Sequence, residues 1–291
     1  STYLGDDITA YLEKFKTTKT AVEYVPNTTT CDLGVDAIAP FTVPAEDRNR
    51  TSPFPYGGHR FEFRAVGSSQ NVSMVNTVLC TIFAESFGMF ADAIEKGAKP
   101  IDVAAEALDA HWKVIFNGNG YSEEWPIEAG KRGVTRIDSG VEAMATLSAP
   151  KNIALFEKMK VLSEKEAKAR TIVMYDHYSG SVEMEALTMV DMINQHVIPS
   201  VKNAELPAEM VKELEAAAAS VSDGLKGMHG AEDEFSKAKL ARVLRLETME
   251  TVRAVCDKAE EVVPADLWTL ATYKELLFLD SHQGAEASMY E

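Results

Sequence analysis

Basic residues are few relative to acidic ones. The sequence has 29 lysines and arginines against 45 aspartates and glutamates, which gives a formal net charge of −16. Nucleic acids and anionic bilayers both attract basic surfaces, so this composition disfavours either as a partner. We therefore expect no nucleic acid and no membrane among the partners of this chain.

Long uninterrupted apolar runs are also absent. The most apolar stretch, residues 72–94, contains Asn76, Glu85 and Asp92, which a membrane-spanning helix would bury at high cost. We predict that no segment spans a membrane. The chain opens on Ser1 without an initiator methionine or a targeting pattern, so we expect a processed chain or a fragment.

Cysteine is scarce. Cys31, Cys80 and Cys256 stand far apart and match no CxxC or Cys/His spacing, and an odd number cannot all pair. We interpret them as reduced, mostly buried thiols. This usage predicts a reducing compartment, which is the cytoplasm or the stroma or matrix of an organelle.

The familiar short catalytic motifs are missing. The sequence has no P-loop, no dinucleotide fingerprint, no nucleophile elbow, no zinc signature and no internal repeat. Its hydrophobic content of 46% is ample for a buried core. Any chemistry must therefore come from a less common arrangement of residues in a folded chain.

The beginning of the chain is β-like and irregular, and the remainder has helical spacing, which predicts an α+β fold that is predominantly α-helical. A short helix is expected over residues 6–16, followed by loops around a short strand at residues 33–38. Residues 59–66 alternate bulky apolar with charged side chains, the period of a strand with one buried face. Glu62 and Arg64 should therefore point the same way.

Helices are expected over residues 72–94 and 100–116. Ser163 and Glu166 have the spacing of a capping box, which predicts the start of a long helix. Because proline lacks an N–H and disrupts a helix interior, Pro199 is expected to end that helix.

A second helical stretch predicts an antiparallel hairpin. Pro207 suits the first turn of a helix that breaks near residues 224–230, and a partner helix is expected over about residues 231–261. The apolar positions of the partner repeat every three or four residues. Packing of one helix on another explains this pattern without a cofactor.

Arginines gather in one short region. Arg50 lies in the loop at residues 47–52, and Arg60 and Arg64 flank Glu62. Guanidinium groups suit phosphate or carboxylate, and a carboxylate beside them could take Mg²⁺ from a metal–phosphate complex. From spacing alone, a solvated edge strand and an Arg-rich surface loop explain the region better.

Three segments in and after this region form a recognisable series. They are Asn-Arg-Thr-Ser-Pro-Phe at residues 49–54, Phe-Glu-Phe-Arg-Ala-Val-Gly-Ser-Ser-Gln at residues 61–70, and Asn-Thr-Val-Leu at residues 76–79. They resemble the closing active-site motifs of type III glutamine synthetases. The family pattern is an Asn-Arg-Ser-like loop, then a basic residue, then Glu-x-Arg on a strand that leads into a helix.

Further segments resemble sequence peculiar to type III, at residues 116–125, 185–189 and 267–278. The likeness runs from about residue 3 to residue 278, nearly the whole chain. It implies three regions: the C-terminal part of the catalytic domain at residues 1–98, the type III helical region at 99–279, and a flexible tail at 280–291.

The resemblance implies a role for each charged residue of the cluster. Glu62 matches the glutamate that ligates an active-site Mg²⁺ or Mn²⁺ ion. Arg64 matches the arginine that holds the α-carboxylate of the substrate glutamate. Arg60 matches a basic residue near the nucleotide, and Arg50 matches the arginine that neutralises the transferring phosphoryl group.

The resemblance also implies a reaction and partners. The intact enzyme would be an ATP-dependent glutamate–ammonia ligase that makes glutamine from glutamate and ammonium through γ-glutamyl phosphate, in a large homo-oligomer, as a dodecamer. The remaining metal ligands of the family lie upstream of the matching stretch, so this chain alone should be inactive. The alternative is a ligase-derived structural or assembly protein that uses its helical surface.

Two further groups are weaker candidates. Residues 117–120, Asn-Gly-Asn-Gly, could face a ligand, but a glycine-rich connection between helices explains them better. Met184, Met189 and Met192 are expected to pack in the core.

Overall fold

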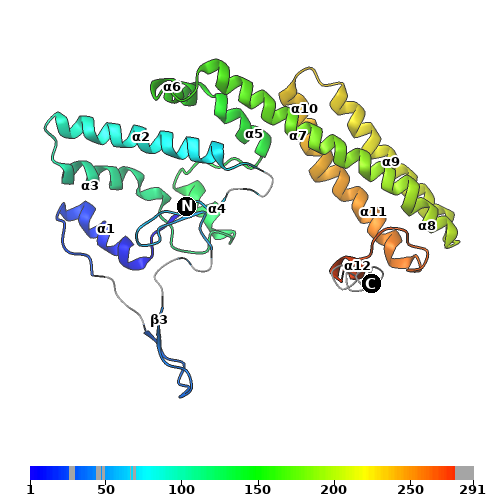
Figure 1. Cartoon of the computed structure of the whole chain (residues 1–291), viewed down its shortest axis with the longest axis horizontal. Coiled ribbons are helices and arrows are strands. Elements are labelled where there is room, and N and C mark those ends of the chain that lie inside the picture. Colours follow the sequence, from blue (N-terminus) through cyan, green and yellow to red (C-terminus); the bar gives the residue numbers. More distant parts are fainter. Residues whose placement is uncertain (26–29, 44–46, 48–49, 66, 68–69, 279–291) are drawn as a thin grey trace, which may run out of the picture. The chain divides into compact units, whose positions relative to one another are not determined.

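A computed structural model describes residues 1–25, 30–43, 47, 50–65, 67 and 70–278 of the chain. The described residues are mostly helical with a few short strands, which confirms the predicted fold class (Figure 1). The chain divides into two compact units. The first comprises Ser1–Asp138 and Ala154–Val161, and the second comprises Ser139–Ile153 and the residues from Leu162 onward.

The first unit contains short strands and helices. Its elements are β1 (Thr2–Tyr3), α1 (Asp6–Thr18), β2 (Thr30–Cys31), β3 (Phe41–Thr42), β4 (Phe54–Pro55), α2 (Ser73–Glu95), α3 (Pro100–His111), the 3₁₀ turn η1 (Trp112–Val114) and α4 (Glu124–Lys131). The predicted helix near residues 6–16 is confirmed as α1, which lies against α3. Lys16 of α1 pairs with Asp109 of α3 at 3.2 Å. The predicted helix at 100–116 ends earlier, because the chain becomes extended at Ile115.

Two strand pairs organise the beginning of the chain. β1 pairs with β4 in parallel, with Thr2 opposite Phe54, and Thr2 also bridges Ile115. β2 and β3 pair antiparallel. The first arrangement places residues near positions 2, 54 and 115 side by side, although they are far apart in the sequence.

The strand expected at residues 33–38 is wrong, because these residues form the turn between β2 and β3. Gly34 adopts φ +66°, and its N–H donates to Asp32 Oδ1 at 2.9 Å. Ile38 N donates to the Val35 carbonyl at 2.8 Å. An aspartate followed two residues later by a glycine with positive φ is typical of a turn, and this local chemistry outweighs the apolar composition.

The strand expected at residues 59–66 is only partly formed among the described residues. The Glu62 and Arg64 amides donate to the carbonyls of Pro55 and Pro53, at 3.0 and 2.8 Å. Proline has no N–H, so neither proline can donate in return, and half of the ladder is missing. The segment is therefore extended and held on one side without becoming a regular strand. Val66 lies outside the described residues.

Helix α2 confirms the helix predicted at residues 72–94, and Gly97 follows it with φ +100°. In length and composition α2 meets the requirements of a membrane-crossing helix, with a mean hydropathy of 1.4 over its most apolar window. Glu85 lies within it and pairs with Lys158 at 2.7 Å. The expectation that no segment spans a membrane stays a prediction.

The second unit is a helical assembly. Its elements are α5 (Gly140–Ala145), the 3₁₀ turn η2 (Thr146–Ser148), part of α6 (Pro150–Lys158), α7 (Glu164–Met192), the π turn η3 (Ile193–Val197), α8 (Ile198–Asn203), α9 (Ala208–His229), α10 (Glu234–Val243), the π turn η4 (Leu244–Thr248), α11 (Met249–Val262) and α12 (Tyr273–Leu277). The predicted capping box is confirmed: Ser163 Oγ accepts from Glu166 N, and the Glu166 carboxylate accepts from Ser163 N.

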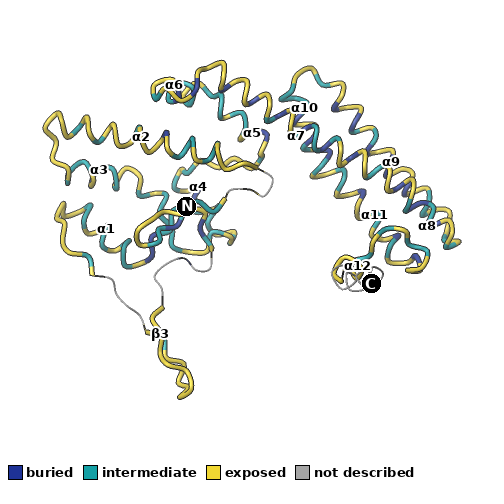
Figure 2. Tube along the Cα trace, in the orientation of Figure 1, coloured by how far each residue is buried: buried dark blue, intermediate teal, exposed yellow. Residues whose placement is uncertain are grey.

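The predicted antiparallel hairpin is confirmed by α9 and its partner α10–α11, and both pack on α7. Buried positions run along the faces that these helices turn toward one another (Figure 2). The core includes Val182, Ile193, Leu214, Val221 and Leu244, each at most 2% exposed. Periodic apolar residues thus bury against partner helices, as their spacing predicts.

Pro199 does not end the long helix, contrary to the expectation. The chain passes through the π turn η3 and continues as α8, in whose first turn Pro199 lies. A helix tolerates proline in its first turn, where its missing N–H is not needed, and the π turn widens the backbone before it. The proline therefore marks a change of helical geometry.

The three predicted regions remain predictions. The tail expected at residues 280–291 lies outside the described residues. The cysteine expectation is corrected in part: all three are free thiols, but Cys80 is exposed, and Cys31 and Cys256 are only partly buried.

Candidate functional site

The four candidate residues line one cavity in the first unit. Arg50, Arg60, Glu62 and Arg64 surround a volume of about 390 Å³. The remaining walls are Asp47 and the segment Pro55–Tyr56–Gly57. Side chains that the sequence distributes over two motifs therefore converge on one polar pocket.

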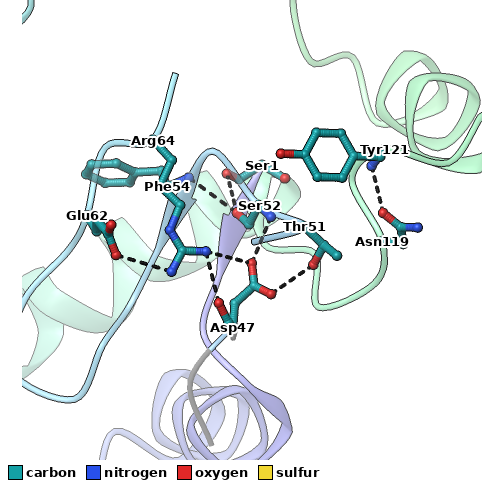
Figure 3. Close-up of polar contacts among 9 residues, drawn as sticks. All are labelled: Ser1, Asp47, Thr51, Ser52, Phe54, Glu62, Arg64, Asn119 and Tyr121. Carbon is teal, nitrogen blue, oxygen red and sulfur yellow. Dashed lines mark hydrogen bonds and ion pairs between the residues drawn. The ribbon is translucent and has the colours of Figure 1, made fainter. Parts of the chain in front are cut away.

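Arg64 is the most firmly held of these side chains (Figure 3). Its Nη1 lies 3.2 Å from Asp47 Oδ2 and 3.0 Å from the Asp47 carbonyl, and its Nη2 lies 3.2 Å from Glu62 Oε2. The Arg64 side chain is 20% exposed and that of Glu62 is 50% exposed. Glu62 and Arg64 thus point the same way, as the alternation predicts, and Glu62 keeps carboxylate surface open to the cavity.

Asp47 connects the two motifs, a role that sequence reasoning missed. Its buried carboxylate accepts from Thr51 Oγ1 at 3.0 Å, from Ser52 N at 2.8 Å and from Arg64. Burial raises the pKa of the nearby Tyr3 hydroxyl, and the negative charge of Asp47 adds to that shift. An aspartate shortly before Thr and Ser could have indicated this, because such side chains often bond backbone amides nearby.

The Arg50 backbone adopts a left-handed conformation, with φ +57°. Such a conformation is uncommon for a residue other than glycine and persists where neighbouring contacts impose it. Arg50 is exposed and lines the cavity. Its guanidinium is therefore accessible to an anion from solvent.

Arg60 is also exposed, on the opposite motif. The Gly57 N–H donates to the Arg60 carbonyl at 2.7 Å, which closes the turn that carries it. Arg60 Nη1 lies 3.3 Å from His59 Nε2. The guanidinium therefore lines the cavity without an acidic partner among the described residues.

The charges around the cavity favour an anion. Three guanidinium groups and two carboxylates line it. The Asp47 carboxylate is already paired with Arg64 and accepts hydrogen bonds from two neighbouring donors. A guanidinium in a polar pocket binds phosphate or carboxylate by paired hydrogen bonds. The arrangement suits one oxyanion bound by Arg50 and Arg60 and a second oxyanion bound beside Arg64.

A complete metal site is not present in the described part of the chain, where no three His, Cys, Asp or Glu side chains form a group that could hold an ion. Glu62 fits as one ligand, because its carboxylate is half exposed and faces the cavity. Two metal ions need several carboxylates between them. The remaining ligands would have to come from outside these residues.

The second unit contains a larger, apolar cavity of about 970 Å³. Met184, Met189 and Met192 line it. Met184 is 66% exposed and Met192 is 40% exposed, so the expectation that these methionines pack in the core is wrong for both. Only Met189 packs on the core from a partly buried position. A flexible thioether tolerates exposure on such a surface, which periodicity alone does not reveal.

Comparison with known proteins shows which family the chain resembles. Residues 101–217 match the family model described as the glutamine synthetase C-terminal domain. The chain is 30% identical to a protein of Dictyostelium discoideum named type-3 glutamine synthetase, over 96% of this chain and 43% of that protein. It is 26% identical to a glutamine synthetase of Bacteroides fragilis, over 96% of this chain and 44% of that protein.

Residues 101–217 are therefore similar to the C-terminal domain of the glutamine synthetases. Nearly the whole chain is similar to a protein named type-3 glutamine synthetase, which confirms the resemblance seen in the motifs. A further relative, a glutamine synthetase of Butyrivibrio fibrisolvens, is 28% identical over 82% of this chain. The chain spans less than half the length of each of these relatives.

Proposed function

We propose that this chain forms part of an ATP-dependent glutamate–ammonia ligase that makes glutamine through γ-glutamyl phosphate. The observation that carries the proposal is the convergence of Arg50, Arg60, Glu62 and Arg64 on one cavity, in a chain similar to glutamine synthetases. ATP must phosphorylate the γ-carboxylate of glutamate, so two anions have to approach each other. Fixed cations lower the free energy of that approach.

Each side chain has a role consistent with its position. Arg64, anchored by Asp47, would bind the α-carboxylate of glutamate, because its orientation is set before the substrate arrives. Arg50 would offset the charge of the transferring phosphoryl group, and the exposed Arg60 would contact the nucleotide. Ammonia then displaces phosphate from the acyl phosphate.

Glu62 would supply one ligand to a divalent cation, Mg²⁺ or Mn²⁺, through its half-exposed carboxylate. The metal would neutralise phosphate charge and orient ATP. Since the described residues provide only this ligand, we propose that the chain is inactive alone and that a homo-oligomer, a dodecamer by family likeness, completes the site. Its three free cysteines fit a reducing compartment, the cytoplasm or an organelle.

The test uses the protein expressed from its full reading frame, with glutamate, ammonium and MgATP. Glutamine formation that requires all three, and that Glu62→Ala abolishes, is the expected result. Arg64→Ala should raise the KM for glutamate by about tenfold or more, because a charge-assisted contact is lost. Glu13→Ala removes another exposed glutamate, from α1, and serves as the control, which should turn over normally.

Absence of glutamine formation, together with no MgATP binding by calorimetry, would overturn the proposal. That result would favour the alternative, a ligase-derived structural or assembly protein. Full turnover by Glu62→Ala would remove the metal role from this residue even if the ligase activity stands.

A further inference from the structure

The loop Phe116–Asn117–Gly118–Asn119–Gly120 contacts Thr51, the residue that follows Arg50. The Gly120 N–H donates to the Thr51 carbonyl at 2.9 Å. A Cβ built on Gly120 would stand 2.2 Å from that carbonyl oxygen. Only glycine therefore allows this approach, and the two loops are in direct backbone contact.

The contact between Gly120 and Thr51 lies next to the strained backbone of Arg50. Arg50 has φ +57°, and the two residues after it are held from both sides. On one side the Asp47 carboxylate accepts from Thr51 Oγ1 and Ser52 N. On the other side Gly120 fixes the Thr51 carbonyl. A left-handed arginine is stable only where surrounding contacts of this kind over-determine it.

The loop itself is anchored through Asn117. Asn117 Oδ1 accepts from the Leu4 and Gly5 amides at 3.1 Å each, and its Nδ2 donates to Thr9 Oγ1 at 2.9 Å and to Asp6 Oδ1 at 3.3 Å. All four bonds reach the start of α1. They fix the loop to the same short N-terminal segment whose strand β1 pairs with β4.

Aromatic packing stiffens the other side of the loop. Phe116 stacks on Trp125 of α4 with ring centroids 4.5 Å apart. Gly118 lies against the same Phe116 ring, where a Cβ would stand 2.5 Å from Cζ. Asn119 Oδ1 accepts from Tyr121 N at 2.9 Å, which closes the turn after it. The loop thus has little freedom to move away from Thr51.

We propose that the Phe116–Gly120 loop is a positioning element for Arg50, which we call the brace. Residues 101–217 match the glutamine synthetase C-terminal domain, so the brace belongs to that domain and acts on the motif loop before it. The proposal rests on the proposed function. It assigns to the C-terminal domain a part in building the phosphate-facing wall, through Gly120 and Asn117.

The activity test is a double-mutant cycle in the full-length protein. Gly120→Ala should lower kcat by about tenfold or more with a smaller change in the KM for glutamate, because the hydrogen bonds of Arg64 go to Asp47 and Glu62 and not to the brace. Gly130→Ala is the matched control, since Gly130 lies in α4 with open space around its Cβ position. In an Arg50→Ala background, Gly120→Ala should have almost no further effect on kcat.

Equal losses of kcat in both backgrounds would show a general structural role and overturn the proposal. Full kcat in folded Gly120→Ala would overturn it as well. If Gly120→Ala does not fold, Asn117→Asp takes its place in the cycle, because it keeps both acceptor bonds to Leu4 and Gly5 and loses the two donors.

A second measurement does not depend on catalysis. Amide hydrogen exchange of residues 50–52 and 54 should be about tenfold faster in Gly120→Ala than in Gly130→Ala, because the held conformation opens more often. Unchanged exchange overturns the brace. If the wild-type protein makes no glutamine but the two glycine variants show this exchange difference, the proposed function is refuted and the brace is supported.

Discussion

Arg64 and Asp47 form an ion pair across two motifs, with Nη1 and Oδ2 3.2 Å apart and the Asp47 side chain only 3% exposed. The same carboxylate also holds Thr51 and the Ser52 amide. One buried acid therefore sets both the arginine that would bind glutamate and the loop that carries Arg50. Removal of the Asp47 carboxylate should therefore weaken both the stability of the fold and the binding of glutamate.

Asp47→Asn should lower the free energy of unfolding by about 2 kcal/mol, because the amide leaves buried donors without their acceptor. It should also raise the KM for glutamate, because Arg64 loses its anchor. Chemical denaturation and steady-state kinetics measure the two effects. Asp109→Asn is the control: Asp109 is 74% exposed in its pair with Lys16, and such surface pairs contribute little. Equal stability of the two variants would contradict the prediction.

Two glycines of α9 should respond in opposite ways to alanine. A Cβ on Gly224 would stand 2.6 Å from Leu244 Cδ1, and Leu244 is buried at 2% exposure, so Gly224→Ala should cost about 1–3 kcal/mol through overpacking. Gly227 has open space, and Gly227→Ala should stabilise the helix by up to about 1 kcal/mol. Thermal unfolding measures both, and a shift of the same sign in the two variants would refute the packing argument.

Ser179 is fully buried, and its Oγ has no hydrogen-bond partner among the described residues. Ser179→Ala should raise the free energy of unfolding by about 1 kcal/mol, because it removes an uncompensated polar group and favours the helix. Thr171, in the same helix, donates to the Ala167 carbonyl at 3.0 Å, so Thr171→Val should instead destabilise by about 1 kcal/mol. A loss of stability in Ser179→Ala would show that the hydroxyl is satisfied in solution.

Burial raises the pKa of the Cys256 thiol to about 11, and the neighbouring Asp257 adds to the shift. The thiolate is the reactive form, so at pH 8 only about one Cys256 in a thousand is reactive. Alkylation by iodoacetamide should be much slower at Cys256 than at the exposed Cys80, and should accelerate as the pH approaches 11. Peptide mass spectrometry follows both sites, and denaturant should abolish the difference. Equal rates in the folded protein would contradict the prediction.

The helices were predictable from the sequence because their signals are local. Apolar periodicity located α2, and the Ser163–Glu166 spacing located the start of α7. The errors occurred where two local signals competed. Apolar residues at 33–38 suggested a strand, whereas Asp32 and Gly34 made a turn, and Pro199 suggested an end that a π turn avoids.

The resemblance of the motifs predicted the candidate residues. The alternation of apolar and charged residues predicted that Glu62 and Arg64 point the same way. The link between Asp47 and Arg64 could not be predicted with the same ease, because it depends on how the chain folds back between them. The contact of Gly120 with Thr51 is even harder to predict from the sequence, because no local pattern indicates it. Such contacts join segments whose spacing carries no period.

The brace and its anchors also determine when the cavity wall can form during folding. Asn117 bonds Gly5 across 112 positions, and Gly120 bonds Thr51 across a long intervening stretch that includes α2 and α3. Chain entropy opposes the closure of such long loops until their contacts are complete. Local helices such as α2 and α3 should therefore appear early, and the arginine pocket should appear last. Binding of an anion in that pocket would then report that the first unit has finished folding.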